Sequence, residues 1–164
     1  MSKEQWFAVA TKPRQEQVAE ANLTRQGYRA VLPLIEVPKR RQGKWTKVIE
    51  PLFSGYLFVR LELGKDNLAP IRSTLGCRDI VRIGLDLVPV PREVMAPLLS
   101  LNSSPQTSDV LFSEGDEVAI AAGPFAGLKG VFKLARGKER AELFIALLGK
   151  VRPITIALDD LALP

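Results

Sequence analysis

The stretch Tyr56-Leu57-Phe58-Val59-Arg60-Leu61-Glu62-Leu63 is the clearest strand signal in this chain of 164 residues. Successive side chains of a strand point to opposite sides of the sheet. One side therefore carries a complete apolar set, which consists of Leu57, Val59, Leu61 and Leu63. The other side carries two aromatic residues and then two charges, Tyr56, Phe58, Arg60 and Glu62. Because covering two charges would be costly, we expect this side to be open and its aromatic residues to bind a protein. The alternative is that a helix over residues 92–101 covers them.

Other strand and helix signals alternate along the first hundred residues. They predict strands at 6–11, 30–37, 48–49 and 79–83, and helices at 14–26, 68–75 and 92–101. Gly27 is a candidate C-cap of the first helix, and Pro91 suits the start of the last one. Residues 39–47 are expected to form a basic loop. The fold class predicted is α+β, with a mainly antiparallel sheet flanked by short helices.

A polar stretch separates this domain from a second, smaller one. Residues 102–109 are Asn-Ser-Ser-Pro-Gln-Thr-Ser-Asp, which is typical of a flexible linker. We expect an N-terminal domain at 1–101, a linker at 102–112 and a C-terminal domain at 113–164. Short apolar runs at 117–121, 130–134, 141–148 and 153–158 are separated by glycine-containing turns. Strands at this spacing predict a small β-barrel for the C-terminal domain.

Positive charge is concentrated in the N-terminal part of the chain. The net charge is +5, of which residues 1–100 contribute +6 and residues 101–164 contribute −1. Residues 38–47 contain five cations and no acid, with Gly43 at a turn and Trp45 available for stacking. Lys39, Arg40 and Arg41 are therefore candidate phosphate contacts, and a solvated hairpin tip is the equally consistent alternative. Lys12 and Arg14, at the start of a helix, form a second candidate.

The composition excludes most catalytic and metal chemistry. The chain has no His, so His-based metal sites, triads and general bases are ruled out. The single Cys77 cannot form an internal disulfide and is expected to be a buried structural thiol. We expect no enzymatic activity, no metal and no cofactor. Residues 1–5 show no secretory signal and no segment is long enough to span a bilayer, so we expect a cytoplasmic protein.

Three motifs resemble the NusG family of transcription elongation factors. Glu50-Pro51-Leu52-Phe53-Ser54-Gly55-Tyr56-Leu57-Phe58-Val59 is similar to the family's central strand signature. Gly115-Asp116-Glu117-Val118 with Gly123-Pro124-Phe125-Ala126-Gly127-Leu128-Lys129-Gly130 resembles its KOW motif. Trp6-Phe7-Ala8-Val9 followed by Lys12-Pro13-Arg14 resembles its first strand and helix. The resemblance spans nearly the whole chain, and its length and Glu-Pro-Leu-Phe run look more like the specialised RfaH group than housekeeping NusG.

The resemblance implies that the N-terminal domain binds RNA polymerase and suppresses pausing. The contacts implied are the clamp helices of the β′ subunit and, across the DNA channel, the β subunit. By position, the clamp-binding patch comprises Phe53, Tyr56, Phe58, Ile83 and Met95. The region that contacts the non-template DNA strand matches Lys12, Arg14, Gln15, Arg72 and Thr74. Asn22 and Leu75 depart from the RfaH pattern, which carries a His and an Arg there, so recognition of the same DNA element does not follow.

For the C-terminal KOW domain, the resemblance implies partner recruitment. Ribosomal protein S10 is the implied partner, with Rho as a second one, and the S10-facing positions are Phe125, Leu148, Gly149 and Lys150. In RfaH-like proteins this domain also forms a helical hairpin that masks the clamp patch, and Glu50 and Arg140 match the pair that stabilises that form. Within residues 138–148 only Ile145 is β-branched, which favours helix at least as much as strand. Gly123, Pro124, Gly127 and Gly130 oppose a helix in the preceding half.

The preferred interpretation is a monomeric, non-enzymatic transcription elongation and antitermination factor. An RNA-binding or ribosome-associated KOW protein without a polymerase role is the alternative. It would require aromatic residues among Lys and Arg rather than beside Leu and Met. An enzyme that uses carboxylates and a metal is a third class, and it would require clustered acids that the sequence lacks.

Overall fold

A four-stranded antiparallel sheet forms the centre of the N-terminal domain. The computed structural model describes residues 4–101, 125 and 128–150. The strands are β1 (Glu4–Thr11), β2 (Arg29–Val31), β5 (Tyr56–Glu62) and β6 (Cys77–Ile80), in the order β2-β5-β1-β6. β1 and β5 pair along their length, from Glu4 opposite Glu62 to Ala10 opposite Tyr56. The α+β fold class and the strand predicted at residues 56–63 are confirmed, although Leu63 lies beyond the strand end and is exposed.

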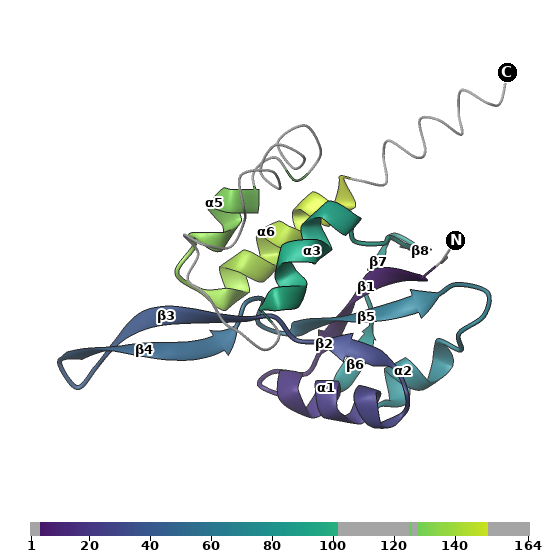
Figure 1. The fold of residues 1–164 in the computed structure, drawn as a ribbon, viewed down its shortest axis with the longest axis horizontal. Coiled ribbons are helices and arrows are strands. Elements are labelled where there is room, and N and C mark those ends of the chain that lie inside the picture. Colours follow the sequence, from purple (N-terminus) through teal and green to yellow (C-terminus); the bar gives the residue numbers. More distant parts are fainter. Residues whose placement is uncertain (1–3, 102–124, 126–127, 151–164) are drawn as a thin grey trace, which may run out of the picture.

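Two helices cover one face of this sheet (Figure 1). These are α1 (Glu16–Arg25) and α2 (Ala69–Ser73), and both were predicted. Alternate residues of β1 and β5 point to these helices and form a closed core, which consists of Phe7, Val9, Leu57, Val59 and Leu61 with Ala19, Leu23 and Ile71 from the helices. Cys77 belongs to the same core, and its burial raises the pKa of the thiol to about 11. The thiol is therefore structural, as expected.

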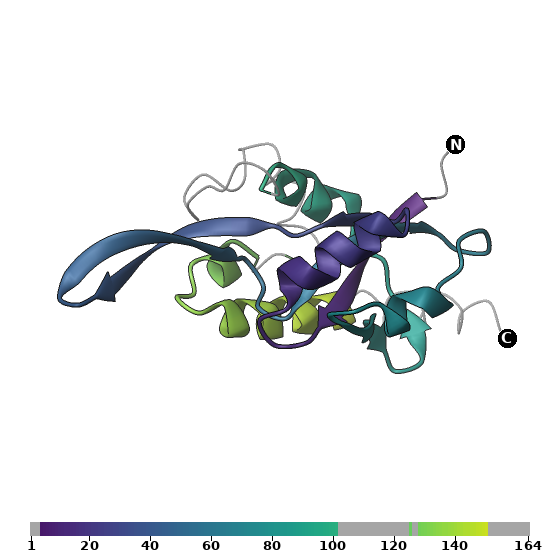
Figure 2. The ribbon, with the colours of Figure 1, turned by 90° about the horizontal axis from the view of Figure 1, so that it is seen from below.

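A long two-stranded ribbon projects from the domain (Figure 2). It consists of β3 (Leu34–Arg41) and β4 (Lys44–Pro51), paired from Leu34 opposite Pro51 to Arg41 opposite Lys44. The prediction of a basic loop at residues 39–47 is therefore wrong, because most of these residues are in strands. Gln42 and Gly43 make the turn and both have positive φ, at 52° and 78°. Turns of this kind match the twist of a hairpin and let the strands pair up to the tip.

The other face of the sheet is covered by α3 and by two C-terminal helices. α3 (Arg92–Ser100) begins after Pro91, as predicted, and a small hairpin of β7 (Arg82–Ile83) and β8 (Asp86–Leu87) precedes it. α5 (Leu128–Phe132) and α6 (Gly137–Gly149) lie on the same side as α3 (Figure 1). No helix among the described residues is long and apolar enough to cross a membrane.

The C-terminal helices correct part of the β-barrel prediction. Residues 130–134 and 141–148 were expected to be strands, but α5 and α6 occupy almost all of them. The buried residues of α6, which are Gly137, Arg140, Ala141, Phe144 and Leu148, follow the three- and four-residue spacing of one helix face, whereas a strand would bury every second residue. The helical hairpin named as the alternative is thus the form observed. The linker and the strands expected at 117–121 and 153–158 lie outside the described residues.

Candidate functional site

An apolar face on the N-terminal domain brings together the five residues of the expected clamp patch. Phe53 precedes β5, Tyr56 and Phe58 lie on it, Ile83 ends β7 and Met95 lies on α3. Phe53, Phe58 and Met95 are core members of one hydrophobic cluster, and Tyr56 and Ile83 pack against it half-buried. We call these five residues the apolar face. They converge because β5 presents its second side where α3 and the β7–β8 hairpin meet the sheet.

Helices α5 and α6, which we call the lid, cover the apolar face. Phe144 of α6 lies against Phe53 and Phe58, with ring centroids 4.4 Å and 5.7 Å apart. Phe132 of α5 lies 6.0 Å from Phe53. Aromatic pairs at such separations each contribute about 0.5–1.5 kcal/mol beyond the burial of their area. The expectation that the second side of β5 is open is therefore wrong for Phe58, which is fully buried by both α3 and the lid.

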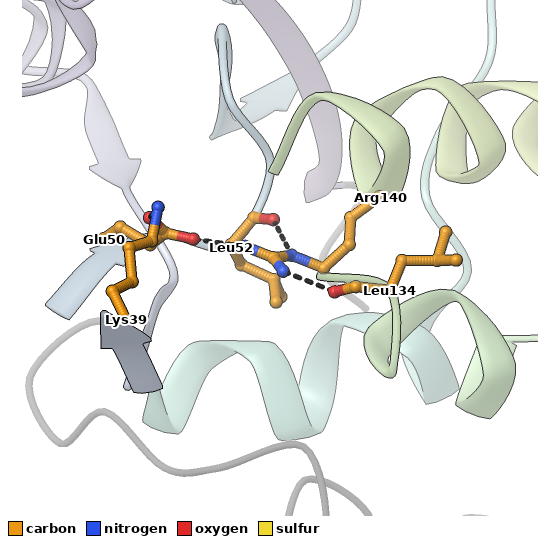
Figure 3. Close-up of polar contacts among 5 residues, drawn as sticks. All are labelled: Lys39, Glu50, Leu52, Leu134 and Arg140. Atoms are coloured by element: carbon orange, nitrogen blue, oxygen red, sulfur yellow. Dashed lines mark hydrogen bonds and ion pairs between the residues drawn. The ribbon is translucent and has the colours of Figure 1, made fainter. Parts of the chain in front are cut away.

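A buried arginine fastens the lid to the ribbon (Figure 3). The Arg140 side chain has no solvent exposure and satisfies three donor positions. Its Nε donates to the Leu52 carbonyl at 2.7 Å, its Nη1 to the Leu134 carbonyl at 2.7 Å and its Nη2 to Glu50 Oε1 at 2.9 Å. A buried guanidinium is tolerated only when it is paired and hydrogen-bonded in this way. The lid is thus held by a specific polar contact as well as by apolar packing.

Glu50 joins the arginine to the basic ribbon. Its second oxygen, Oε2, lies 2.8 Å from Lys39 Nζ. Burial alone would raise the pKa of the Glu50 carboxyl, but the hydrogen bonds and positive charges of Lys39 and Arg140 outweigh burial and lower it. Lys39 was expected to contact DNA, and in this structure its ammonium is instead paired within the chain.

The other cations of the ribbon are exposed. Arg40, Arg41 and Lys44 form no ion pair within the described residues, whereas Lys47 lies 3.5 Å from Glu36. Residues directly opposite in the register share one side of the ribbon. Arg40 therefore lies on the same side as Trp45, which is 69% exposed. The ribbon tip thus offers a stacking surface beside cations, which is a combination that suits nucleic acid.

The second group of expected DNA contacts lies where α1 and α2 meet. Lys12 and Arg14 are exposed in the turn before α1, and Arg72 is exposed on α2. Gln15 is the N-cap residue of α1 but makes no capping hydrogen bond with its side chain. Thr74 departs from the expectation of a free contact: it is buried, and its hydroxyl accepts from Gln26 Nε2 at 2.7 Å and donates to the Pro70 carbonyl at 2.8 Å.

Comparison with known proteins identifies the family. A model of the family described as "Transcription termination factor nusG" matches residues 4–99. The chain belongs to the NusG family. It is 30% identical over 175 residues to the transcription termination/antitermination protein NusG of Thermus thermophilus, with 93% of this chain and 94% of the relative covered. The protein of the same name from Staphylococcus epidermidis is 28% identical over 170 residues, covering 95% and 93%.

A solved structure of domain interaction in Thermotoga maritima NusG is also similar. It aligns at 26% identity with a TM-score of 0.45, and the alignment covers 60% of this chain and 57% of that one. NusG-family proteins are non-enzymatic transcription factors, in agreement with the prediction that this chain is not an enzyme. Within the described residues no three acidic, Cys or His side chains are placed to hold a metal.

In this member of the NusG family, the expected S10-facing residues lie in the lid or directly beside its ends. Phe125 and Leu148 are buried at the contact between lid and domain, Gly149 approaches Ile83, and Lys150 caps the end of α6. Phe125 also packs against Phe144, with ring centroids 5.4 Å apart. Phe125 and Leu148 are therefore not accessible to another protein in this structure.

Sequence reasoning missed the lid residues that contact the N-terminal domain. Phe132 and Phe144 were not singled out, nor was the Leu52 carbonyl that receives Arg140. A signal existed for Phe144, because Arg140, Phe144 and Leu148 recur every fourth residue as on one face of a helix. No sequence signal marks a backbone carbonyl as an acceptor for a distant side chain.

Proposed function

We propose that this chain is a transcription elongation and antitermination factor of the RfaH-like kind that binds RNA polymerase through its apolar face. The observation that carries the proposal is that a pair of helices already covers this face. A surface that buries its aromatic residues against one helical hairpin is suited to receive another, and the clamp helices of the β′ subunit are such a partner. The β subunit is a second expected contact, across the DNA channel.

In this proposal the closed lid is a masked form. The lid and the polymerase compete for Phe53, Phe58 and Met95, so polymerase binds only the fraction of molecules whose lid is open. Binding then holds the clamp closed and suppresses pausing. The released C-terminal segment is free to form the KOW barrel and to bind ribosomal protein S10, with Rho as another candidate. The buried state of Phe125 and Leu148 supports this order of events.

Contacts with the non-template DNA strand complete the proposed function. The exposed cations Lys12, Arg14 and Arg72 and the ribbon residues Arg40 and Arg41 are the proposed phosphate contacts. Gln15 and Thr74 are close to Arg14 and Arg72 along the chain, and Thr74 acts through position rather than through a free hydroxyl. Leu75 is 66% exposed where the RfaH pattern has an Arg, so the DNA element read by this chain is expected to differ.

Binding to stalled RNA polymerase elongation complexes tests the proposal. The lid is first opened by Glu50→Ala, and Tyr56→Ala/Ile83→Ala is then added because both side chains are half-buried and tolerate truncation. We expect Glu50→Ala to bind more tightly than the natural chain and the triple variant to lose that binding. Leu63→Ala, an exposed apolar residue off the face, is the matched control and should change nothing.

Two non-template strand sequences separate a specialist from a generalist. If binding depends on the DNA sequence, the RfaH-like kind is favoured. If binding is the same on both sequences, a NusG-like generalist is favoured. If neither the natural chain nor Glu50→Ala binds any elongation complex, the polymerase role is wrong. The ribosome-associated or RNA-binding alternative would then take its place.

A further inference from the structure

A cleft of about 830 Å³ lies between the N-terminal domain and the lid, beside the Glu50–Arg140 ion pair. One wall comes from the end of β1, the turn before α1 and the segment that joins β4 to β5. The other wall comes from the first turns of α6, through Lys138, Ala141 and Glu142. Figure 2 shows the turn between β1 and α1 beside α6. The volume is within the range of small-molecule sites, about 300–1,000 Å³.

Three cations from separate elements line this cleft. They are Arg14 from the turn before α1, Arg78 from β6 and Lys138 from α6. None of them forms an ion pair within the described residues, and all three are exposed. Arg14 also has φ of 61°, a left-handed conformation that is costly for a residue other than glycine and recurs at functional sites. Three acids, Glu16, Glu50 and Glu142, line the same cleft, but none of them is ion-paired with these cations among the described residues. The unpaired cations can therefore hold an anionic group.

The remaining lining is unlike a site for a bare inorganic anion. Tyr56, Pro13 and Pro51 supply apolar surface that can contact a planar ring. Glu142 is an exposed acceptor, and Glu16, a buried one, binds the Gly55 amide through one oxygen at 2.8 Å. Glu50, the other acid, is already neutralised by Lys39 and Arg140. Acceptors and apolar surface beside cations match a base, ribose hydroxyls and a phosphate.

We propose that this cleft binds a free nucleoside phosphate. The phosphate lies among Arg14, Arg78 and Lys138, and the nucleoside lies against Tyr56 and the prolines. Because Lys138 and Glu142 leave with the lid, the ligand binds the closed form better than the open one. At 100 times its Kd a ligand that binds only the closed form favours that form by about 100-fold. Binding to the open form through Arg14 and Arg78 lowers this factor. Only this regulatory consequence rests on the proposed masking of the polymerase-binding face; the binding site itself does not.

Calorimetry on the full chain tests the site, with ATP and GTP as probes and adenosine and inorganic pyrophosphate as partial probes. We expect saturable binding of a nucleotide that is stronger than that of either partial probe. Arg78→Ala and Lys138→Ala should each weaken it roughly tenfold or more, because each removes a charged hydrogen-bond donor. Arg29→Ala and Lys133→Ala, exposed cations away from the cleft, are the matched controls and should bind normally.

Hydrogen exchange of the α6 amides, measured without polymerase, tests whether the nucleotide favours the closed form of the lid. Nucleotide should slow exchange in the natural chain and in the two control variants, but not in Lys138→Ala. The proposal is overturned if neither nucleotide binds. It is also overturned if Arg78→Ala and Lys138→Ala bind nucleotide as tightly as the natural chain does. Binding of a short single-stranded oligonucleotide without binding of either free nucleotide also overturns it. These results do not depend on whether the ligand-free chain binds polymerase.

Discussion

Arg140 of α6 and Glu50 of β4 form an ion pair of 2.9 Å in which the guanidinium is fully buried and the carboxylate side chain is 19% exposed. The two residues are 90 positions apart in the sequence. Their contact ties the lid to the ribbon, and Lys39 ties the same carboxylate to the basic surface. Glu50 is therefore the one group shared, among the described contacts, by the lid and the ribbon cations.

Glu50→Ala is expected to loosen the lid. It leaves the Arg140 charge buried with only two backbone carbonyls as partners. Removing one partner of a buried pair costs about 3–5 kcal/mol, and the partial exposure of Glu50 reduces this to about 2 kcal/mol. Hydrogen exchange of the α6 amides should accelerate accordingly. Glu36→Ala breaks the exposed pair with Lys47 on the same ribbon. It should change the free energy of lid opening by about 1 kcal/mol or less.

The pH dependence of lid docking follows from the same carboxylate. The pKa of Glu50 is lowered in the folded chain below its ordinary value of 4.5. A carboxyl whose folded-state pKa is depressed contributes stability above its ordinary pKa and loses it as pH falls through the folded value. The protection of the lid amides, which is the slowing of their exchange relative to the intrinsic rate at the same pH, should therefore be constant near neutral pH and decrease below about pH 4.5. In Glu50→Gln this acid-induced loss of protection should disappear, and its persistence there would assign it to another group.

The fold of the N-terminal domain followed from local patterns that tertiary packing reinforced. The alternation in β5 located the strand, and Gly27 and Pro91 marked helix boundaries correctly. The inner half of the ribbon agrees with the strands expected at 30–37 and 48–49, and its outer half with the hairpin tip named as the alternative. The loop expected at 39–47 is wrong because backbone pairing around Gln42 and Gly43, rather than an apolar pattern, holds these exposed charged residues in strands.

The lid could be foreseen only as an alternative, because its conformation depends on what it packs against. Residues 138–148 suit a helix locally, but the glycines before them oppose one, and Gly130 lies inside α5. The cost of that glycine, about 1 kcal/mol, is offset by burial of Phe132 and Phe144 on the apolar face. The five residues of the apolar face lie together, but the expectation that they are exposed was wrong, because the segment that covers them is distant in sequence.

Phe144→Ala is expected to release the lid by a different route. Phe144 contacts three other rings, and truncating a buried Phe costs about 3–5 kcal/mol. Alanine is a better helix former than Phe, so α6 is not weakened locally. Accelerated exchange of lid amides and tighter binding to elongation complexes are the expected results. Leu143→Ala, at a neighbouring residue that is 47% exposed, should reproduce neither.

Gly76→Ala is expected to destabilise the N-terminal domain through a close backbone approach. Gly76 has φ of 91°, and an added Cβ would lie 2.8 Å from the backbone nitrogen of Ala19 in α1. Gly64 has φ of 87° and open space around it, so Gly64→Ala reports the conformational strain alone, about 1–2 kcal/mol. Gly76→Ala should lose roughly 1–3 kcal/mol more in urea unfolding. Equal losses for the two variants would contradict the close approach.

Gly137→Ala tests how closely the start of α6 approaches the domain. An added Cβ would collide with Ser54 Oγ and lie 3.3 Å from Ser54 Cβ, while the Ser54 amide donates to the Gly137 carbonyl at 3.3 Å. We expect the free energy of lid opening to fall by about 1–2 kcal/mol, as for overpacking elsewhere, and hydrogen exchange of the lid amides to accelerate. Ser54→Gly removes both obstructing atoms and keeps the backbone hydrogen bond, so the double variant should recover about 1 kcal/mol. Without that recovery, the loss in Gly137→Ala would have to arise within α6 itself.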